Sequence, residues 1–292
     1  MLETVDGDIL SKIDLITKAG EKVQSTLVVC NHVPTAQDVY RDLVKKVNDA
    51  VLLHSQFTRR DRNEIENGLL RSKLPQEHRS YKKLPRILVS TQVVEVSLDL
   101  DFQQGFTEPA PIDAIVQRLG RINRYASRPP TQVSIFSKQA HPYNIYDKDL
   151  TAKSLRVLSV LPRPLVEEGL NHAADRVYGK GYSPDNQEDY EEGLNYSPIK
   201  KFKKYLVAGT NQNWIDNIID EKEGSIDLLP EPLVNEYNGL KNEGLKIEAN
   251  NLLVPVGRWR GEYLFNDERI DTSQDPWVLL DCKYSKEIGL EI

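Results

Sequence analysis

The feature that most constrains the fold is a regular alternation of short apolar runs and amphipathic segments between residues 26 and 136. The apolar runs lie at 26–30, 50–54, 86–91 and 132–136. Each has the length of a strand that is buried on both faces. The segments with helical spacing of apolar residues lie at 34–47, 58–73 and 112–125. Strands and helices that alternate through short connections predict right-handed crossovers and a parallel sheet.

The pattern changes after residue 148, which divides the chain into three regions. Residues 149–200 begin with helical periodicity and end in a polar stretch, so they are predicted to form a helical linker. Residues 201–292 mix helical and short strand-like segments, which is typical of a small α/β domain. We therefore expect an α/β fold with a parallel sheet flanked by helices over 1–148, the linker, and an accessory C-terminal domain over 201–292.

The net charge conceals a division between the two halves of the chain. The 292 residues include 38 Lys+Arg and 44 Asp+Glu, a net charge of −6, which by itself argues against a nucleic-acid partner. Residues 1–150, however, have a net charge of +2, and residues 151–292 have a net charge of −8. The window 54–86 contains nine Lys+Arg and four Asp+Glu. A nucleic-acid contact therefore remains compatible with the first half, and the second half is expected to present an acidic surface.

Composition also indicates the compartment. No apolar run approaches the roughly 20 residues of a membrane span, and no basic and apolar leader follows Met1. Two cysteines, 30 and 282, do not suggest a disulfide framework. We expect a cytoplasmic protein without a membrane partner.

The most informative segment is QRLGRINR at 117–124. On a helix that starts near Ile112, Gln117, Arg121 and Arg124 would form one polar stripe, interrupted by the small residue Gly120. Two guanidinium groups one turn apart can bind successive phosphate oxygens. Taken alone, an arginine pair of this kind is more often a solvated basic helix face.

Other segments support the phosphate interpretation through a family resemblance. QRLGRINR resembles motif VI (QxxGRxxR) of superfamily 2 helicases, STQVVEVSLDLDF at 90–102 resembles motif V, and 26–43 resembles the start of a second RecA-like domain. LLHSQFTRRDR at 52–62 and the closing YSKEIGL at 284–290 are similar to the CRISPR-associated helicase of type I interference systems. The resemblance covers nearly the whole chain and corresponds to the C-terminal half of such a helicase.

The resemblance implies roles for individual residues. Arg121 and Arg124 would act on the ATP phosphates with support from Gln117, and Asp99 and Gly120 would also lie on the nucleotide side. The resemblance implies nucleic-acid contacts at Thr91, Ser90 and Asn31, and the basic window after the second strand makes His54, Ser55, Arg59 and Arg62 candidates for further phosphate contacts. Two alternatives stay open: a strand-end hydroxyl at 90 that bonds only to local main chain, and an ordinary solvated charged helix after 58.

Two sequence signatures of a complete ATPase are missing from this chain. It contains no GxxxxGK[ST] loop and no acidic box in the expected place, so ATP is expected to be shared with a first RecA-like domain, in cis or in trans, which also holds Mg²⁺. The five histidines include no His-Asp dipeptide, so a separate HD nuclease is a candidate partner. No metal site is expected in the chain itself.

The resemblance therefore implies the C-terminal half of an ATP-dependent DNA helicase or translocase of CRISPR interference, inactive without its P-loop domain. It would supply arginine fingers and part of a single-stranded DNA track after recruitment by a guide-RNA surveillance complex. Two alternatives are a fragment of another superfamily 2 repair or RNA helicase and a non-catalytic adaptor derived from a helicase.

Overall fold

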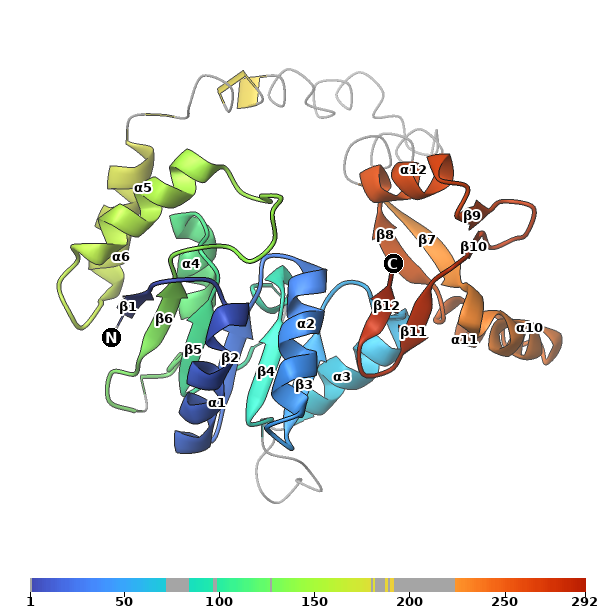
Figure 1. The fold of residues 1–292 in the computed structure, drawn as a ribbon, viewed down its shortest axis with the longest axis horizontal. Helices are drawn as coiled ribbons and strands as arrows, with labels where there is room; N and C mark the ends of the chain where they lie inside the picture. Colours follow the sequence, from blue (N-terminus) through green and yellow to red (C-terminus); the bar gives the residue numbers. More distant parts are fainter. Residues whose placement is uncertain are drawn as a thin grey trace, which may run out of the picture.

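The computed structural model describes residues 2–71, 84–96, 99–126, 128–179, 181, 187–188, 190–191 and 224–292. Within these ranges the chain forms a six-stranded parallel sheet between two layers of helices, together with a smaller mixed sheet (Figure 1). The predicted fold class is confirmed. The end of the predicted linker and the start of the accessory domain, at 192–223, lie outside the described residues.

All strands of the large sheet are parallel, in the spatial order β1-β6-β5-β2-β4-β3. Four of them coincide with the apolar runs of the sequence: β2 (Thr26–Val29), β3 (Ala50–Leu53), β4 (Ile87–Ser90) and β6 (Val133–Phe136). Every residue of β2, β4 and β6 is buried, because helices cover both faces of the sheet.

The helices divide between the two faces. One face is covered by α1 (Ile13–Lys22) and α2 (Val33–Val44), and the other by α3 (Arg59–Arg71) and α4 (Ile112–Leu119). A short 3₁₀ turn, η1 (Leu10–Lys12), precedes α1. Val28 of β2 packs in the cluster under α1 and α2, whereas Leu27 and Val29 pack toward α3. This alternation follows from the two-residue period of a strand.

Two strands of the large sheet have no strong sequence signal and were not predicted. β1 (Leu2–Val5) pairs with β6 at one edge, and β5 (Gln104–Thr107) lies between β6 and β2. β5 contains Gly105, at which a Cβ would lie 2.2 Å from Cδ1 of Ile122. A glycine inside a strand often marks such a close approach, and it removes the branched side chain that would identify the strand.

The prediction of one helix over Ile112–Tyr125 is wrong at its C-terminal end, because α4 stops at Leu119 and Gly120 is its C-cap residue. Ile122 instead forms a parallel bridge with Phe102, just before β5. Main-chain hydrogen bonds of 2.9 Å flank this bridge on both sides. Pairing with the β5 segment therefore replaces the last turn and a half of the expected helix.

The two helices after residue 147 pack on the large sheet. α5 (Lys148–Ser159) and α6 (Glu167–Tyr178) share an apolar cluster with α4, β1 and β6. The Ser154 hydroxyl of α5 accepts a hydrogen bond from the main-chain N–H of Ile112 at 3.0 Å. The first part of the region 149–200 therefore packs against the large domain. The role of this region as a linker stays a prediction.

The C-terminal part contains a small sheet, in the order β8-β7-β10-β9, and a separate hairpin of β11 and β12. Figure 1 shows the hairpin next to α2 and the start of α3. The elements are β7 (Ser225–Pro230), η4 (Glu231–Leu233), α10 (Val234–Asn242), α11 (Lys246–Asn250), β8 (Val254–Gly257), α12 (Arg258–Asn266), β9 (Ile270–Asp271), β10 (Val278–Leu279), β11 (Lys283–Ser285) and β12 (Gly289–Glu291).

Candidate functional site

The two helicase-like motifs lie side by side on one flank of the large sheet. The motif V segment, defined here as residues 90–102, leaves β4, forms η3 (Gln92–Val94) and reaches the bridge at Phe102. The motif VI loop, defined as residues 120–125, follows α4 directly. The bridge between Phe102 and Ile122 holds the two segments together.

Arg121 makes the closest side-chain link between the motif VI loop and the motif V segment. Its Nε donates a hydrogen bond to the main-chain oxygen of Val94 at 2.9 Å, and its Nη2 donates to the main-chain oxygen of Glu95. Burial, followed by the nearby charge of Arg124, lowers the pKa of Arg121.

Arg124 is the more accessible arginine, with 37% of its side chain exposed. Its Nε lies 3.1 Å from Oδ1 of Asp99, and its Nη1 donates to the main-chain oxygen of Gly120 at 3.3 Å. Asp99 also accepts a hydrogen bond from the hydroxyl of Tyr125 at 2.8 Å. The structure therefore brings together Asp99, Gly120 and Arg124, three of the residues expected on the nucleotide side.

Gln117 lies apart from this arrangement. It is exposed on the last turn of α4, whereas Arg121 and Arg124 lie beyond the end of that helix. The predicted helical stripe of these three side chains is therefore wrong, because Gly120 ends the helix between them.

Arg118, which sequence reasoning did not select, is fully buried at the centre of a polar network. It follows Ile115 by three residues and so lies on the buried face of α4. A buried arginine has to be paired, and five groups accept hydrogen bonds from it at 2.7–3.2 Å: the carboxylate of Glu95, the hydroxyls of Thr107 and Tyr146, the amide oxygen of Asn31 and the main-chain oxygen of Glu108. Arg118 thus ties the ends of β2 and β5 to the motif V segment.

Three residues implied to contact nucleic acid are buried at the carboxyl ends of β2 and β4. Asn31 is 1% exposed, and its Nδ2 donates to a main-chain oxygen at 2.8 Å. The Ser90 hydroxyl is fully buried and donates to the main-chain oxygen of Leu53 at 2.9 Å. Thr91 is also buried. The Ser90 hydroxyl thus bonds to main chain, but its shorter bond reaches the neighbouring strand β3, and the local main-chain oxygen of Thr91 lies 3.3 Å away.

His54 is covered by the C-terminal hairpin. Its Nδ1 accepts a hydrogen bond from the main-chain N–H of Gln56 at 3.1 Å, so Nε2 carries the proton and donates to the main-chain oxygen of Ile288 at 2.8 Å. The ring stacks on Phe57 with a centroid separation of 4.5 Å. Burial lowers the pKa of His54 to about 4, so the ring is neutral at pH 7.

The other residues of this basic segment are more accessible. Ser55 and Arg62 are half-buried, and Arg62 donates to Glu66 within α3 at 2.7 Å. Arg59 is exposed and forms an ion pair with Asp227 of β7. The acidic C-terminal half therefore contacts the basic segment directly, a contact that the charge count did not predict.

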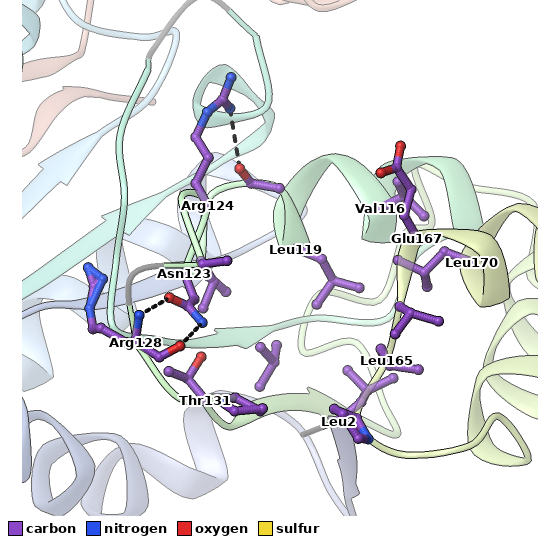
Figure 2. A pocket seen from close by; sticks show the side chains of 17 residues that line it. Leu2, Val116, Leu119, Asn123, Arg124, Arg128, Thr131, Leu165, Glu167 and Leu170 are labelled. Atoms are coloured by element: carbon purple, nitrogen blue, oxygen red, sulfur yellow. Dashed lines mark hydrogen bonds between the residues drawn. The ribbon is translucent and has the colours of Figure 1, made fainter.

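A pocket of about 870 Å³ lies behind the motif VI loop, between α4, β1, β6 and the start of α6 (Figure 2). Its apolar lining includes Leu2, Leu119, Leu165 and Leu170, and the guanidinium of Arg124 extends away from these side chains (Figure 2). An apolar wall does not suit a polyphosphate. The apolar side of this pocket is therefore unsuited to a phosphate group.

Two further observations concern only the ranges that the structure describes. They contain no cluster of three His, Cys, Asp or Glu side chains arranged to hold a metal ion. None of their helices combines the length and the apolar character needed to cross a bilayer.

The parallel sheet flanked by helices is the RecA-like fold expected from the sequence, and the motif V and motif VI segments adjoin on one side of it. More particularly, residues 22–127, which include both motifs, match the family model described as the C-terminal region of the CRISPR-associated nuclease/helicase Cas3. Over most of its length the chain is similar to a protein of this family, of which it covers 39%. The resemblance to CRISPR-associated helicases predicted from the sequence is confirmed.

Individual relatives show the extent of the likeness. A CRISPR-associated nuclease/helicase Cas3 of Methanocaldococcus jannaschii is 26% identical over 301 residues, which cover 96% of this chain but 39% of the relative. A CRISPR-associated endonuclease/helicase Cas3 of Escherichia coli is 38% identical over 119 residues, which cover 40% of this chain and 13% of the relative. This chain therefore spans well under half of the length of these relatives.

Solved structures support the fold. The crystal structure of T. fusca Cas3 with ATP matches all of this chain with a TM-score of 0.65 and 19% identity, and the match covers 42% of that protein. A structure described as a CRISPR RNA-guided surveillance complex, pre-nicking, matches all of this chain with a TM-score of 0.63, 18% identity and 44% coverage of its own chain.

Proposed function

We propose that this chain is the C-terminal half of an ATP-dependent superfamily 2 DNA helicase or translocase of CRISPR interference, acting in the cytoplasm. A first RecA-like domain, in cis or in trans, holds ATP and Mg²⁺, and this chain supplies Arg121 and Arg124. Without that domain the chain does not hydrolyse ATP. The proposal depends chiefly on the placement of both arginines in one loop, anchored through Arg121 to the main-chain oxygen of Val94 at 2.9 Å.

The side chains present fit an ATP phosphate in charge and placement. Arg124 is accessible, and Arg121 lies close enough to feel its charge, so a phosphate anion near both would be attracted by two guanidinium groups. ATP supplies the phosphoanhydride bond, and the two guanidinium groups would stabilise the charge that develops on the transferred phosphoryl group. Asp99 orients Arg124, and Gln117, exposed at the end of α4, is proposed to reach the nucleotide only when the first domain is present.

Single-stranded DNA is the proposed second ligand. Its phosphates would meet the accessible residues Ser55, Arg59 and Arg62. The remaining candidates are buried and would shape the sheet edge next to this track; they are Asn31, His54, Ser90 and Thr91. The likeness to a structure of a surveillance complex supports a guide-RNA surveillance complex as partner, and a separate HD nuclease is proposed as a further partner.

The test is DNA-stimulated ATP hydrolysis by this chain assembled with its P-loop domain. We expect Arg124→Ala to lower kcat about 100-fold or more, because it removes charge stabilisation in the transition state. Arg156→Ala, which removes an exposed arginine of α5, is the control and should leave kcat unchanged. Wild-type hydrolysis by Arg124→Ala would instead support the adaptor alternative, and a preference for unwinding RNA duplexes would support an RNA helicase.

A further inference from the structure

The C-terminal hairpin bridges the two parts of the molecule. Residues 283–291, called here the clamp hairpin, contribute Tyr284 and Leu290 to the apolar cluster of the small sheet. The same hairpin bonds to the large domain, because the main-chain oxygen of Ile288 accepts hydrogen bonds from His54 at 2.8 Å and from Gln37 of α2 at 3.1 Å. The hairpin therefore ties the small domain to α2 and to the turn after β3.

The clamp hairpin immobilises both neighbours of Ser55. His54 donates to Ile288, and the main-chain N–H of Leu290 donates to the main-chain oxygen of Gln56 at 2.8 Å. Ser55 is half-buried between these two anchored residues. The main chain at Ser55 is thus held by contacts from a segment more than 200 residues away in the sequence.

Tyr284 organises the next residues, at the N-terminus of α3. Its hydroxyl accepts a hydrogen bond from the main-chain N–H of Thr58 at 3.0 Å and donates to the carboxylate of Asp61 at 2.6 Å. The Thr58 hydroxyl in turn accepts from the main-chain N–H of Asp61 at 3.1 Å, which makes Thr58 the N-cap of α3. Burial and the bond to Asp61 raise the pKa of Tyr284, so its hydroxyl remains a donor at any physiological pH.

The close approach of the clamp hairpin depends on Gly289. This residue has φ = +78°, and a Cβ there would lie 2.7 Å from both the main-chain oxygen of Gln56 and Cε1 of His54. A larger residue would therefore push the hairpin away from the 54–56 turn. Tyr284 and Gly289 both belong to the YSKEIGL segment that the sequence resemblance singles out.

We propose that the clamp hairpin positions the 54–62 segment for binding a nucleic-acid phosphate, with Tyr284 as the positioning residue. This inference rests on the proposed DNA track, of which Ser55, Arg59 and Arg62 form part. A loop that is already ordered loses less conformational entropy when it binds, so the clamp hairpin raises affinity without touching the ligand. The C-terminal domain thereby contributes to DNA binding through the RecA-like domain.

The experiment compares variants of the 292-residue chain by fluorescence anisotropy with a labelled oligothymidylate at one fixed low salt concentration. Tyr284→Phe removes the hydroxyl and keeps the ring. We expect its Kd for the oligonucleotide to rise about threefold to tenfold, because the hydroxyl's two hydrogen bonds to the start of α3 are lost. Tyr263→Phe is the matched control, because Tyr263 is exposed on α12, and its Kd should equal that of the wild type.

Two accompanying measurements separate positioning from general stability. Amide hydrogen exchange at Thr58 and Asp61 should become faster in Tyr284→Phe while the Tm stays near that of Tyr263→Phe. Gly289→Ala should also weaken DNA binding, more than Gly244→Ala does. Gly244 has φ = +83° but no heavy atom within 4 Å of the added Cβ, so it reproduces the backbone strain without the displaced hairpin.

The outcomes distinguish the inference from the proposed function. If the wild-type chain binds the oligonucleotide and Tyr284→Phe binds it equally well, the inference is wrong and the DNA track stands. If the wild-type chain does not bind single-stranded DNA, the proposed track is wrong and the inference fails with it.

Discussion

The carboxylate of Glu95 lies 2.8 Å from Nε of Arg118, with only 12% and 2% of the two side chains exposed. The main-chain oxygen of Glu95 accepts a hydrogen bond from Arg121. One residue of the motif V segment therefore holds both a buried structural arginine and a candidate catalytic arginine. A buried ion pair of this kind adds little net stability over an apolar pair, but removing one partner leaves a charge without compensation.

Glu95→Ala should therefore destabilise the chain by about 3–5 kcal/mol, because Arg118 would stay buried without its carboxylate. The free energy of unfolding from urea titration measures this effect. Glu66→Ala is the control, since it breaks an ion pair with Arg62 that is 35% and 23% exposed within one helix. That loss should be about 0.3–0.5 kcal/mol. Equal losses of unfolding free energy in the two variants would show that the pair of Glu95 and Arg118 contributes no more than an exposed ion pair.

A second prediction concerns pH. His54 has a folded-state pKa of about 4 against an ordinary 6.5, so the unfolded chain takes up a proton first as the pH falls. Stability is therefore intact above about pH 6.5 and is lost between pH 6.5 and pH 4. Between pH 7 and pH 5 the loss from this residue should be about 2 kcal/mol.

Comparison of variants isolates the contribution of His54. His54→Gln keeps a donor for the main-chain oxygen of Ile288 but does not titrate, so its free energy of unfolding should fall less between pH 7 and pH 5 than that of the wild type. His172→Gln replaces a histidine whose side chain is 69% exposed on α6 and should retain the wild-type pH dependence. If the free energy of unfolding of His54→Gln depended on pH as strongly as that of the wild type, His54 would not be the residue responsible for the loss.

The fold could be predicted where burial leaves a strong pattern in the sequence. β2 and β4 are buried on both faces and consist mainly of apolar residues, so their runs predict strands directly. β5 could not be found in this way, because Gly105 is required by the approach of Ile122. The end of α4 was missed for a related reason: the pairing of Ile122 with Phe102 is a tertiary contact that overrides helical periodicity.

The candidate site was predictable in part. The motif spacing indicates Arg121, Arg124 and Asp99, and the structure places all three in neighbouring segments. The motif spacing does not indicate a role for Arg118, because a charged residue in such a motif is normally expected to be exposed. The burial of Arg118 depends on hydrogen-bond partners from separate strands, Thr107 and Asn31. The covering of His54 by the C-terminal hairpin depends on a contact across 234 residues, which no local pattern encodes.

A third prediction concerns the contact between Gly105 of β5 and Ile122 of the motif VI loop. In Gly105→Ala the added Cβ would lie 2.2 Å from Cδ1 of Ile122, so Ile122 has to move. We expect a cost of about 1–3 kcal/mol in the free energy of unfolding, the usual effect of overpacking. Because Ile122 lies between Arg121 and Arg124, the displacement should also lower the DNA-stimulated ATPase activity of the assembled enzyme.

Ile122→Val provides the matched test, since it removes only the Cδ1 atom that would clash. Alone it should cost about 0.5–1.5 kcal/mol. Combined with Gly105→Ala it should relieve the overlap, so the double variant should be more stable than the sum of the two single effects by about 1 kcal/mol. ATPase activity should recover in the double variant relative to Gly105→Ala. Strict additivity of the two costs would show that the Gly105 contact does not set the position of the motif VI loop.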